Sequence, residues 1–334
     1  MKQEILKTEK AISLVKETFA GELSRQLSLV TVSSPIAVLD GTGINDDLNG
    51  IERPVFFPVK ALKDKKAVVV HSLAKWKRLR LKQLEVEPNC GILTDMKALR
   101  PDEDFTALHS IYVDQWDWEQ RIMPEQRTLG FLKETVTKIY SALKTTEQVV
   151  HEYYPHIESV LPEGITFIHS EELLKRYPEL NARERESAAA KEYGAIFIIG
   201  IGGQLSNGES HDGRAPDYDD WSTPNSDGYF GINGDIIVWN PVLECAFELS
   251  SMGIRVDKEA LIRQLEEREC IDRSMLAFHS MLLAGELPES IGGGIGQSRV
   301  CMFMLKKRHI GEVQVSIWPE MEVLKLTAAG VRLL

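Results

Sequence analysis

Cysteine and long apolar runs are scarce in this sequence, and basic residues are fewer than acidic residues. Only 4 of its 334 residues are cysteines, and none has the paired spacing of a zinc ribbon or a disulfide framework. The most apolar segment, residues 195–201, is far shorter than the ~20 residues that span a bilayer. The sequence has 39 Lys and Arg residues and 50 Asp and Glu residues. The resulting net charge of -11 disfavours a broad nucleic-acid-binding face.

The remaining composition is that of a globular protein with a large core, because 43% of the residues are hydrophobic and 27% are charged. Residues 1–29 mix Lys with Glu and have no signal-peptide core. We therefore expect a cytoplasmic protein with no membrane and no nucleic-acid partner. The length alone would allow two domains, but the candidate chemical segments run from about residue 46 to residue 299. This spread favours a single catalytic domain over residues 1–334.

The hydrophobic pattern predicts both helices and strands. Ile5, Ile12, Val15, Phe19, Leu23 and Leu27 recur at spacings of about three or four, which predicts an amphipathic helix. Further helices are predicted over 129–154, 171–193, 258–273 and 275–284. Strands are predicted over 30–38, 68–71, 111–118, 195–200, 235–239 and 245–256. The polar, glycine-containing stretches 40–50 and 202–234 are predicted to be loops, and loops of this kind often carry function.

A glycine-rich segment is the first candidate for chemistry. Residues 291–299 read IGGGIGQSR and precede an apolar run that we expect to form the final helix. Glycines let the backbone approach a ligand, a helix start presents free N–H groups, and Arg299 adds a positive charge. This combination would suit a phosphate, although the spacing matches neither a P-loop nor a dinucleotide fingerprint. The alternative is a glycine-rich packing turn with a surface arginine.

A polar strand is the second candidate. Alternate residues of a strand share a face, so Gln115, Asp117 and Glu119 point one way and Trp116 and Trp118 the other. The aromatic face suggests a buried sheet, in which polar groups need partners. The segment is therefore either a ligand-facing strand or a solvated edge strand.

Two carboxylates in apolar strands are the third candidate. Asp235 and Glu248 would be costly to bury unless they are paired or bound to a metal. Magnesium accepts one or two carboxylates together with nucleotide phosphate oxygens. The alternative is a buried ion pair with Arg255. A weaker candidate is the basic run 71–78, which is either the start of an anion-binding helix or a solvated basic face.

Taken together, these segments resemble two related families. An Arg followed by acidic residues, a polar strand, a Glu-bearing strand ending in Gly-x-Arg and the run GGGIGxxR resemble the catalytic core of class II aminoacyl-tRNA synthetases, especially the aspartyl type. A closer resemblance, over nearly the whole chain, is to the ammonia-dependent asparagine synthetases, the aspartate–ammonia ligases. It is carried by HSLAKWKR at 71–78, MKALRPDED at 96–104, YVDQWDWE at 112–119, RAPDYDDW at 214–221 and residues 247–257.

The closer resemblance implies an α+β fold with a class II synthetase-like catalytic core, in which helices flank an antiparallel sheet, and it implies a homodimer. It also implies that L-aspartate, ammonia and ATP are converted to L-asparagine, AMP and pyrophosphate with the help of Mg²⁺. Glutamine-dependent synthetases use an N-terminal cysteine, whereas position 2 here is Lys2. We therefore expect ammonia from solution to be the nitrogen source.

The resemblance further implies roles for individual residues. The expected ATP-binding residues are Arg100, Ser251, Gly294, Gly296 and Arg299, with Arg100 and Arg299 acting on the phosphates. Asp235 and Glu248 are expected to hold magnesium. We expect Lys77 and Arg255 to bind the carboxylates of aspartate. Its α-ammonium group is expected to be bound by Asp117, Glu119 and Asp219.

The ammonia step needs a group that collects ammonium and then removes a proton, and a carboxylate serves both purposes. Asp46 and Gln115 match the positions that the family uses near the reacting centre, with Asp47 as an alternative to Asp46. Two other functions stay open. A synthetase core that charges tRNA is disfavoured by the net charge of -11. A regulatory protein without turnover is disfavoured by the complete set of ATP-binding residues.

Overall fold

A computed structural model describes residues 2–46, 48 and 52–334 and has the expected α+β architecture. Its main sheet has eight strands, and only the two outermost pairs are parallel. In spatial order the strands are β1 (Leu29–Thr31), β5 (Gly91–Leu99), β6 (Tyr112–Arg121), β11 (Ser290–Gly296), β10 (Cys245–Ile254), β9 (Asn233–Asn240), β8 (Ala195–Ile199) and β7 (Thr166–His169).

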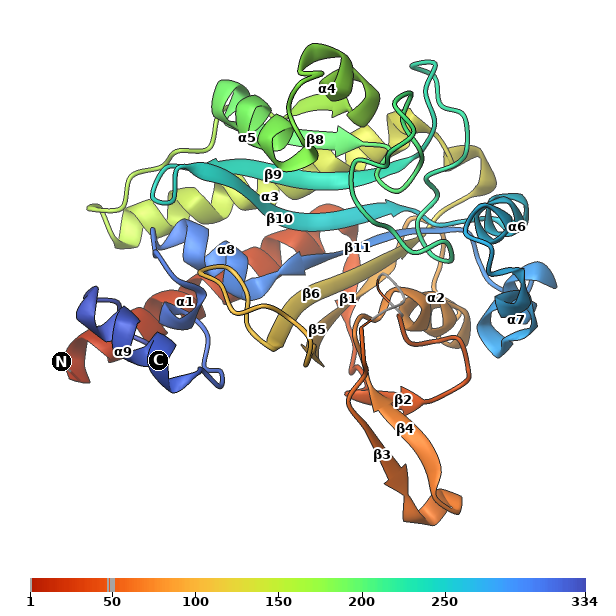
Figure 1. Cartoon of the computed structure of the whole chain (residues 1–334), viewed down its shortest axis with the longest axis horizontal. Helices are drawn as coiled ribbons and strands as arrows, with labels where there is room; N and C mark the ends of the chain where they lie inside the picture. Colours follow the sequence, from red (N-terminus) through yellow and green to blue (C-terminus); the bar gives the residue numbers. More distant parts are fainter. Residues whose placement is uncertain (1, 47, 49–51) are drawn as a thin grey trace.

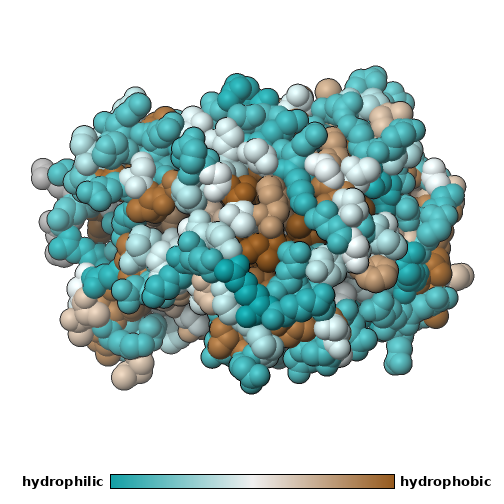
Figure 2. Space-filling view, turned by 90° about the horizontal axis from the view of Figure 1, so that it is seen from above, coloured by the Kyte–Doolittle hydropathy of each residue, from teal (hydrophilic) through white to brown (hydrophobic). Residues whose placement is uncertain are grey.

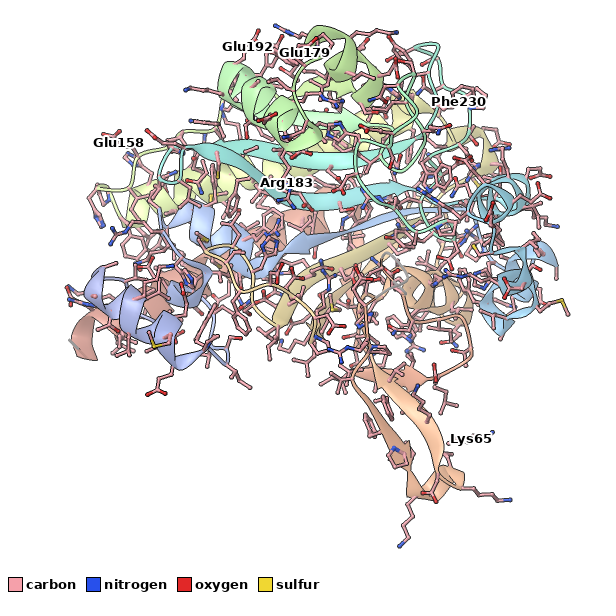
Figure 3. All side chains as sticks on the ribbon, in the orientation of Figure 1. Lys65, Glu158, Glu179, Arg183, Glu192 and Phe230 are labelled. Atoms are coloured by element: carbon pink, nitrogen blue, oxygen red, sulfur yellow. The ribbon has the colours of Figure 1, made fainter. Side chains whose placement is uncertain are left out.

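A smaller sheet projects from the body of the molecule (Figure 1). Its three strands, in spatial order, are β2 (Ala37–Leu39), β4 (Lys65–Val69) and β3 (Phe56–Val59). Lys65 lies on this projection, away from the main sheet (Figure 3). The segment 30–38, which we predicted to be one strand, is therefore divided between the two sheets as β1 and β2.

Helices cover both faces of the main sheet. The long helices α1 (Lys2–Leu27) and α3 (Leu129–Tyr153) run side by side along one face (Figure 1). Phe19 of α1 packs against Trp116 of β6 with ring centroids 4.6 Å apart, so the tryptophan face of β6 forms the core on this side. The opposite face carries α2 (Ala74–Gln83), α4 (Ser170–Arg176) and α5 (Ala182–Tyr193).

The remaining helices confirm some predictions and correct others. The predicted helices over 258–273 and 275–284 correspond to α6 (Lys258–Glu267), the 3₁₀ turn Ile271–Met275 and α7 (Ala277–Leu283). The apolar run after the glycines is α8 (Gln297–Met304). It is not the final helix as predicted, because α9 (Glu320–Ala328) follows it. Three further 3₁₀ turns are Lys60–Leu62, Pro124–Gln126 and Ile310–Glu312.

The glycine-rich segment is a strand and not the turn that we considered. β11 pairs with β6 on one side and β10 on the other, in the middle of the sheet. A Cβ at Gly292 would collide with the Glu119 carboxylate, and a Cβ at Gly294 would collide with the Gln115 amide. Glycine is therefore required because side chains of β6 cross over the β11 backbone, a close approach that strand glycines permit.

Hydrophilic side chains cover most of the face seen from above in Figure 2, and hydrophobic residues gather near its middle. Within the described part of the chain, no helix combines the length and the apolar character needed to cross a membrane.

Candidate active site

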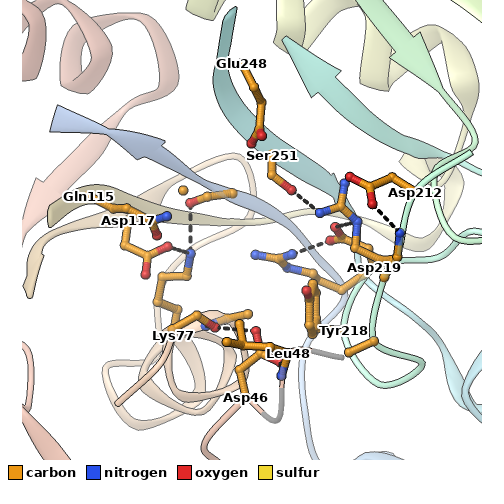
Figure 4. A pocket seen from close by; sticks show the side chains of 18 of the residues that line it. Asp46, Leu48, Lys77, Gln115, Asp117, Asp212, Tyr218, Asp219, Glu248 and Ser251 are labelled. Carbon is orange, nitrogen blue, oxygen red and sulfur yellow. Dashed lines mark hydrogen bonds and ion pairs between the residues drawn. The ribbon is translucent and has the colours of Figure 1, made fainter. Parts of the chain in front are cut away.

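Two adjoining cavities open on the sheet face opposite α1 and α3. The first has a volume of about 250 Å³ and the second about 370 Å³. They form one continuous site because residues from five segments line both: Arg100, Gln115, Asp212, Glu248, Ser251 and Gly294. Figure 4 shows the first cavity, with Gln115 and Asp117 on one side and Tyr218 and Asp219 on the other.

The polar face of β6 supplies the floor of the site, as its alternation predicted. Gln115 and Asp117 line the first cavity, while Trp116 and Trp118 lie in the core on the other face. β6 is an inner strand, so the alternative of a solvated edge strand is wrong. Glu119 shares the polar face but is fully buried and is not among the residues that line either cavity.

Glu119 instead forms a buried ion pair with Arg255. Arg255 Nε and Nη2 donate to Glu119 Oε1 and Oε2 at 3.0 and 2.7 Å, and Ser290 Oγ donates to Oε1 at 2.7 Å. Arg255 Nη1 also donates to Asp219, which lines the first cavity. Burial alone would raise the pKa of Glu119, but Arg255, Lys77 and Ser290 together hold it below its ordinary value. The guanidinium group is thereby fixed at the edge of the cavity.

The basic run at 71–78 is not the solvated face that we considered. Lys75, Lys77 and Arg78 of α2 are 1%, 0% and 3% exposed. Lys77 Nζ donates to Asp117 and, at 2.9 Å, to the carbonyl oxygen of Gly293. Burial lowers the pKa of Lys77, and this effect is opposed by Asp117. Lys77 and Asp117 both line the first cavity, so a cation and an anion stand next to each other there.

The second cavity carries the two arginines predicted to act on phosphates. Arg100 and Arg299 both line it, together with Glu103 and His109. Arg299 Nη1 donates to the main-chain oxygen of Glu248 at 3.0 Å, and its Nη2 donates to His109 Nε2 at 2.5 Å. Burial and the charge of Arg299 lower the pKa of His109 to about 4, so the imidazole is neutral and acts as an acceptor.

Gly296 and Ser251, which we predicted to bind ATP, also border the cavities. Gly296, at the end of β11, lines the second cavity, and Ser251 lines both. The segment from Gly294 to Arg299 therefore borders a cavity large enough for part of a nucleotide, although it does so as a strand end followed by α8.

Asp235 and Glu248 lie near each other but have different surroundings. Asp235 of β9 is 7% exposed and accepts a hydrogen bond from Arg214 Nη2 at 2.5 Å. Glu248 of β10 lines both cavities, and its carboxylate lies 3.4 Å from Arg299 Nη1. Burial, with a contribution from the negative charge of Glu248, raises the pKa of Asp235. We considered a buried ion pair with Arg255 as the alternative to a metal site, and that partner is wrong. Arg255 pairs with Glu119 and Asp219, and Asp235 pairs with Arg214.

Asp46 lies at the lower edge of the first cavity (Figure 4). It is 2% exposed and accepts hydrogen bonds from Ser72 Oγ at 2.9 Å and from the Leu48 N–H at 3.0 Å. Burial raises the pKa of Asp46, and this effect is opposed by Lys75 and reinforced by Asp217. The alternative residue, Asp47, lies outside the described residues.

A family model described as aspartate–ammonia ligase matches residues 6–330. The chain belongs to the aspartate–ammonia ligase family. A relative from Parabacteroides distasonis, named aspartate–ammonia ligase, is 57% identical over 327 residues, covering 98% of this chain and 95% of the relative. A relative of the same name from Clostridium perfringens is 56% identical over 313 residues, covering 94% and 90%.

Solved structures show that this family member shares the class II synthetase fold. Asparaginyl-tRNA synthetase from Pyrococcus horikoshii, complexed with asparaginyl-adenylate, superimposes with a TM-score of 0.67 over 93% of this chain and 70% of the other, at 15% identity. Aspartyl-tRNA synthetase from Entamoeba histolytica gives a TM-score of 0.60 over 94% and 59%, at 14% identity. The expected fold class is therefore confirmed.

The site of this aspartate–ammonia ligase family member contains residues that the sequence analysis did not select. Arg214 is the most important, because it donates to both Ser251 and Asp235 and its Nε lies 3.5 Å from Asp219 Oδ2. Also missed as site residues were Glu103, His109, Asp212 and Tyr218. Arg214 begins the run RAPDYDDW, which carried the family resemblance, so its charge in that run was the available signal.

Proposed function

We propose that this member of the aspartate–ammonia ligase family joins L-aspartate and ammonia at the expense of ATP, giving L-asparagine, AMP and pyrophosphate through a β-aspartyl-adenylate. The main structural support for this proposal is the pair of joined cavities. One presents paired cations and anions suited to an amino acid, and the other presents Arg100 and Arg299. The family membership supports the same reaction.

The first half-reaction brings negative groups together. An oxygen of the aspartate β-carboxylate attacks the α-phosphorus of ATP, and pyrophosphate leaves with the electrons of the broken P–O bond. Arg100 and Arg299 border the cavity where the phosphates would lie, so their charges are in place before the reaction. Fixed charges that face the developing negative charge stabilise a transition state more than mobile water does.

Aspartate itself would bind in the first cavity. Lys77 and Arg255 would bind its carboxylates, and Asp117 and Asp219 would bind its α-ammonium group; all four residues line this cavity. These four side chains already form ion pairs with each other or with Glu119, so the substrate would enter a site whose charges are balanced and held. Because Glu119 is fully buried, we revise its predicted role. It orients Arg255 and does not contact the substrate.

The carboxylates of Asp235 and Glu248 fit a magnesium ion. Burial and the negative charge of Glu248 raise the pKa of Asp235, and a divalent cation would relieve the repulsion between the two carboxylates. Among the described residues, no group of three or more His, Cys, Asp or Glu side chains is arranged to hold a metal ion, so nucleotide phosphates would supply further ligands. When bound, magnesium would neutralise part of the charge on the ATP phosphates. Asp235 and Glu248 would hold it, and Arg214 would orient Asp235.

In the second half-reaction, ammonia attacks the β-carbonyl carbon of the adenylate and AMP leaves. Asp46 would bind the incoming ammonium ion and take one of its protons, and the proposal is supported by its position in the cavity that Gln115 also lines. Its raised pKa makes Asp46 a stronger base than an exposed aspartate.

A product assay tests this function. The protein is incubated with aspartate, ATP and magnesium, with either ammonium or glutamine as the nitrogen source, and the products are separated by mass. We expect equal amounts of asparagine, AMP and pyrophosphate with ammonium, and much less asparagine with glutamine. Formation of ADP, or no asparagine, would contradict the proposal.

We also infer a cytoplasmic homodimer that folds as one catalytic domain over residues 1–334 and has no nucleic-acid partner. All four cysteines are unpaired, which is typical of a reducing compartment. Large apolar side chains are exposed on β1 and the small sheet, such as Val30 at 67% and Phe56 at 61%, which supports a partner subunit. Residues from 46 to 314 line the cavities, which supports one domain. Light scattering of the purified protein tests the dimer.

A further inference from the structure

A buried cluster behind Asp46 has no role in the function proposed above. Asp217 Oδ2 lies 2.8 Å from Lys75 Nζ and 2.9 Å from His279 Nε2, and all three side chains are at most 1% exposed. Because an ionised carboxylate accepts only, His279 Nε2 carries the proton and donates to Asp217. The guanidinium group of Arg273 lies 3.7 Å from the same oxygen.

His279 also contacts the loop that carries Asp46. The main-chain N–H of Phe278 donates to the carbonyl oxygen of Thr42 at 3.2 Å. Gly43 has a φ of +72°, and a Cβ there would lie 2.9 Å from His279 Nδ1. The loop packs directly against the imidazole ring at Gly43. Only glycine readily combines this backbone conformation with so little space. α7 thus contacts the Asp46 loop through the Phe278 N–H and the His279 ring, and it contacts Asp217 through His279 Nε2.

The cluster determines the electrostatic surroundings of Asp46. Lys75 favours its ionised form, and Asp217 opposes it. Burial would raise the pKa of Asp217, but Lys75 and His279 hold it well below its ordinary value, so its negative charge is permanent. Titratable and charged groups face this pair from the start of α2, the long loop and the segment up to α7: His71, Lys75, Tyr218, Cys270, Arg273 and His279.

Two buried polar atoms of the cluster, Asp217 Oδ1 and His279 Nδ1, have no hydrogen-bond partner among the described residues. Burying such an atom without a partner usually costs stability. Two unpartnered polar atoms would not be expected in a cluster that only stabilises the fold. Their presence therefore favours a role for the cluster in the neighbouring site.

We propose that Asp217 and His279 are positioning residues for the ammonia step: His279 holds Asp217 and the Asp46 loop together, and Asp217 offsets the charge of Lys75 so that Asp46 can accept a proton from ammonium. The proposal rests on the assignment of Asp46 to that step. One ammonium N–H bond breaks and its proton passes to the Asp46 carboxylate. The freed nitrogen lone pair attacks the β-carbonyl carbon, the bond to AMP breaks, and the new amide nitrogen loses its second proton to solvent.

The test measures the two half-reactions separately in the full-length protein. Adenylate formation is followed without ammonia by aspartate-dependent exchange of labelled pyrophosphate into ATP. The ammonia step is followed as asparagine formation across pH. In Asp217→Asn, which keeps the shape and removes the charge, we expect normal exchange and an ammonia step about tenfold slower. The rate of the ammonia step falls at acid pH as Asp46 becomes protonated. In Asp217→Asn this fall, the acid limb of the pH profile, should move to lower pH by about one unit, because a negative charge that raises the pKa of Asp46 is gone.

His279 gives an independent pair of variants. His279→Gln keeps an N–H donor near Asp217 and should retain most of the ammonia step, whereas His279→Leu should lose about tenfold. His169→Leu is the matched control, because His169 is another buried histidine whose Nε2 donates to a main-chain oxygen, at 2.8 Å, outside both cavities. It should leave both half-reactions unchanged. Thermal unfolding of each variant shows whether it folds.

The inference would be overturned if Asp217→Asn lost both half-reactions in parallel and its pH profile did not shift. A normal ammonia step in His279→Leu would also overturn it. If Asp217→Asn does not fold, the comparison of His279→Gln with His279→Leu decides. Failure of the proposed function is distinguishable, because in that case the wild-type protein itself makes no asparagine.

Discussion

Arg100 and Arg299 line the same cavity, although Arg100 follows β5 and Arg299 lies in the first turn of α8. Arg100 Nη2 donates to the carbonyl oxygen of His71 at 3.2 Å, and Arg299 Nη1 donates to that of Glu248 at 3.0 Å. A main-chain acceptor thus holds each guanidinium group, and the Glu248 carboxylate also lies 3.4 Å from Arg299 Nη1. Both positive charges border one cavity, where they would meet the phosphates.

Replacing Arg299 by alanine should remove most adenylate formation. Losing one preorganised donor at a site of developing charge typically costs about 10² to 10³ in rate. The fold should persist, because the Arg299 side chain is 22% exposed and lies at the cavity edge. Pyrophosphate exchange and thermal unfolding measure the two effects. Arg25→Ala, which removes an exposed arginine paired with Glu22, is the control. Normal exchange in Arg299→Ala would refute the phosphate role.

Replacing Asp46 by asparagine should affect the other half-reaction. The amide keeps the shape of the carboxylate but neither attracts ammonium nor takes its proton, so asparagine formation should fall by about 10² to 10⁴. Adenylate formation should continue, since we assign Asp46 neither to the phosphates nor to the charged groups of aspartate. A variant that loses pyrophosphate exchange but turns over preformed adenylate normally would show that Asp46 serves the opposite step.

The buried Glu119–Arg255 pair should matter for stability as well as for the site. Glu119→Gln leaves Arg255 with less compensating charge and should destabilise the protein by about 3 to 5 kcal/mol in urea unfolding. The pKa of Glu119 in the folded protein lies below its ordinary 4.5. Its contribution is therefore present above pH 4.5 and lost as the pH falls through the lower folded value. The difference between wild type and variant should shrink correspondingly in acid; a difference independent of pH would contradict the pairing.

His109 offers a spectroscopic test of the second cavity. Its imidazole should stay neutral until about pH 4 in an NMR titration, because burial and the neighbouring Arg299 oppose its charge. In Arg299→Ala the pKa should rise toward the ordinary 6.5. Since unfolded His109 binds a proton near pH 6.5, its contribution to stability is lost between pH 6.5 and about 4. An ordinary pKa in the wild type would mean that the two side chains are apart.

Much of the site follows from local patterns in the sequence. The alternation in β6 correctly predicted that Gln115 and Asp117 share a face opposite Trp116, because the period of two is a property of every strand. The amphipathic period likewise predicted α1. The motifs that resemble the ligase family placed Arg100 and Arg299 in one site, which a local pattern could not do.

Other features depend on contacts between distant segments. The glycines of β11 have the composition of a turn, and only the β6 side chains that cross them explain why a strand needs them. The partner of Asp235 is Arg214, from a long loop with no periodicity. Lys75 and Lys77 resemble a solvated basic helix until Asp217 and Asp117 from other segments pair with them. Charge partners of this kind are fixed by tertiary packing, which sequence spacing does not encode.

Transfer of oxygen from aspartate to AMP tests the central claim most directly. The β-carboxylate of aspartate is labelled with ¹⁸O, and the products formed with ammonium, ATP and magnesium are analysed by mass spectrometry. The account predicts one labelled oxygen in AMP, because the oxygen that attacks the α-phosphorus leaves with AMP when ammonia attacks the carbonyl carbon. Unlabelled AMP, or label in inorganic phosphate released together with ADP, would contradict it.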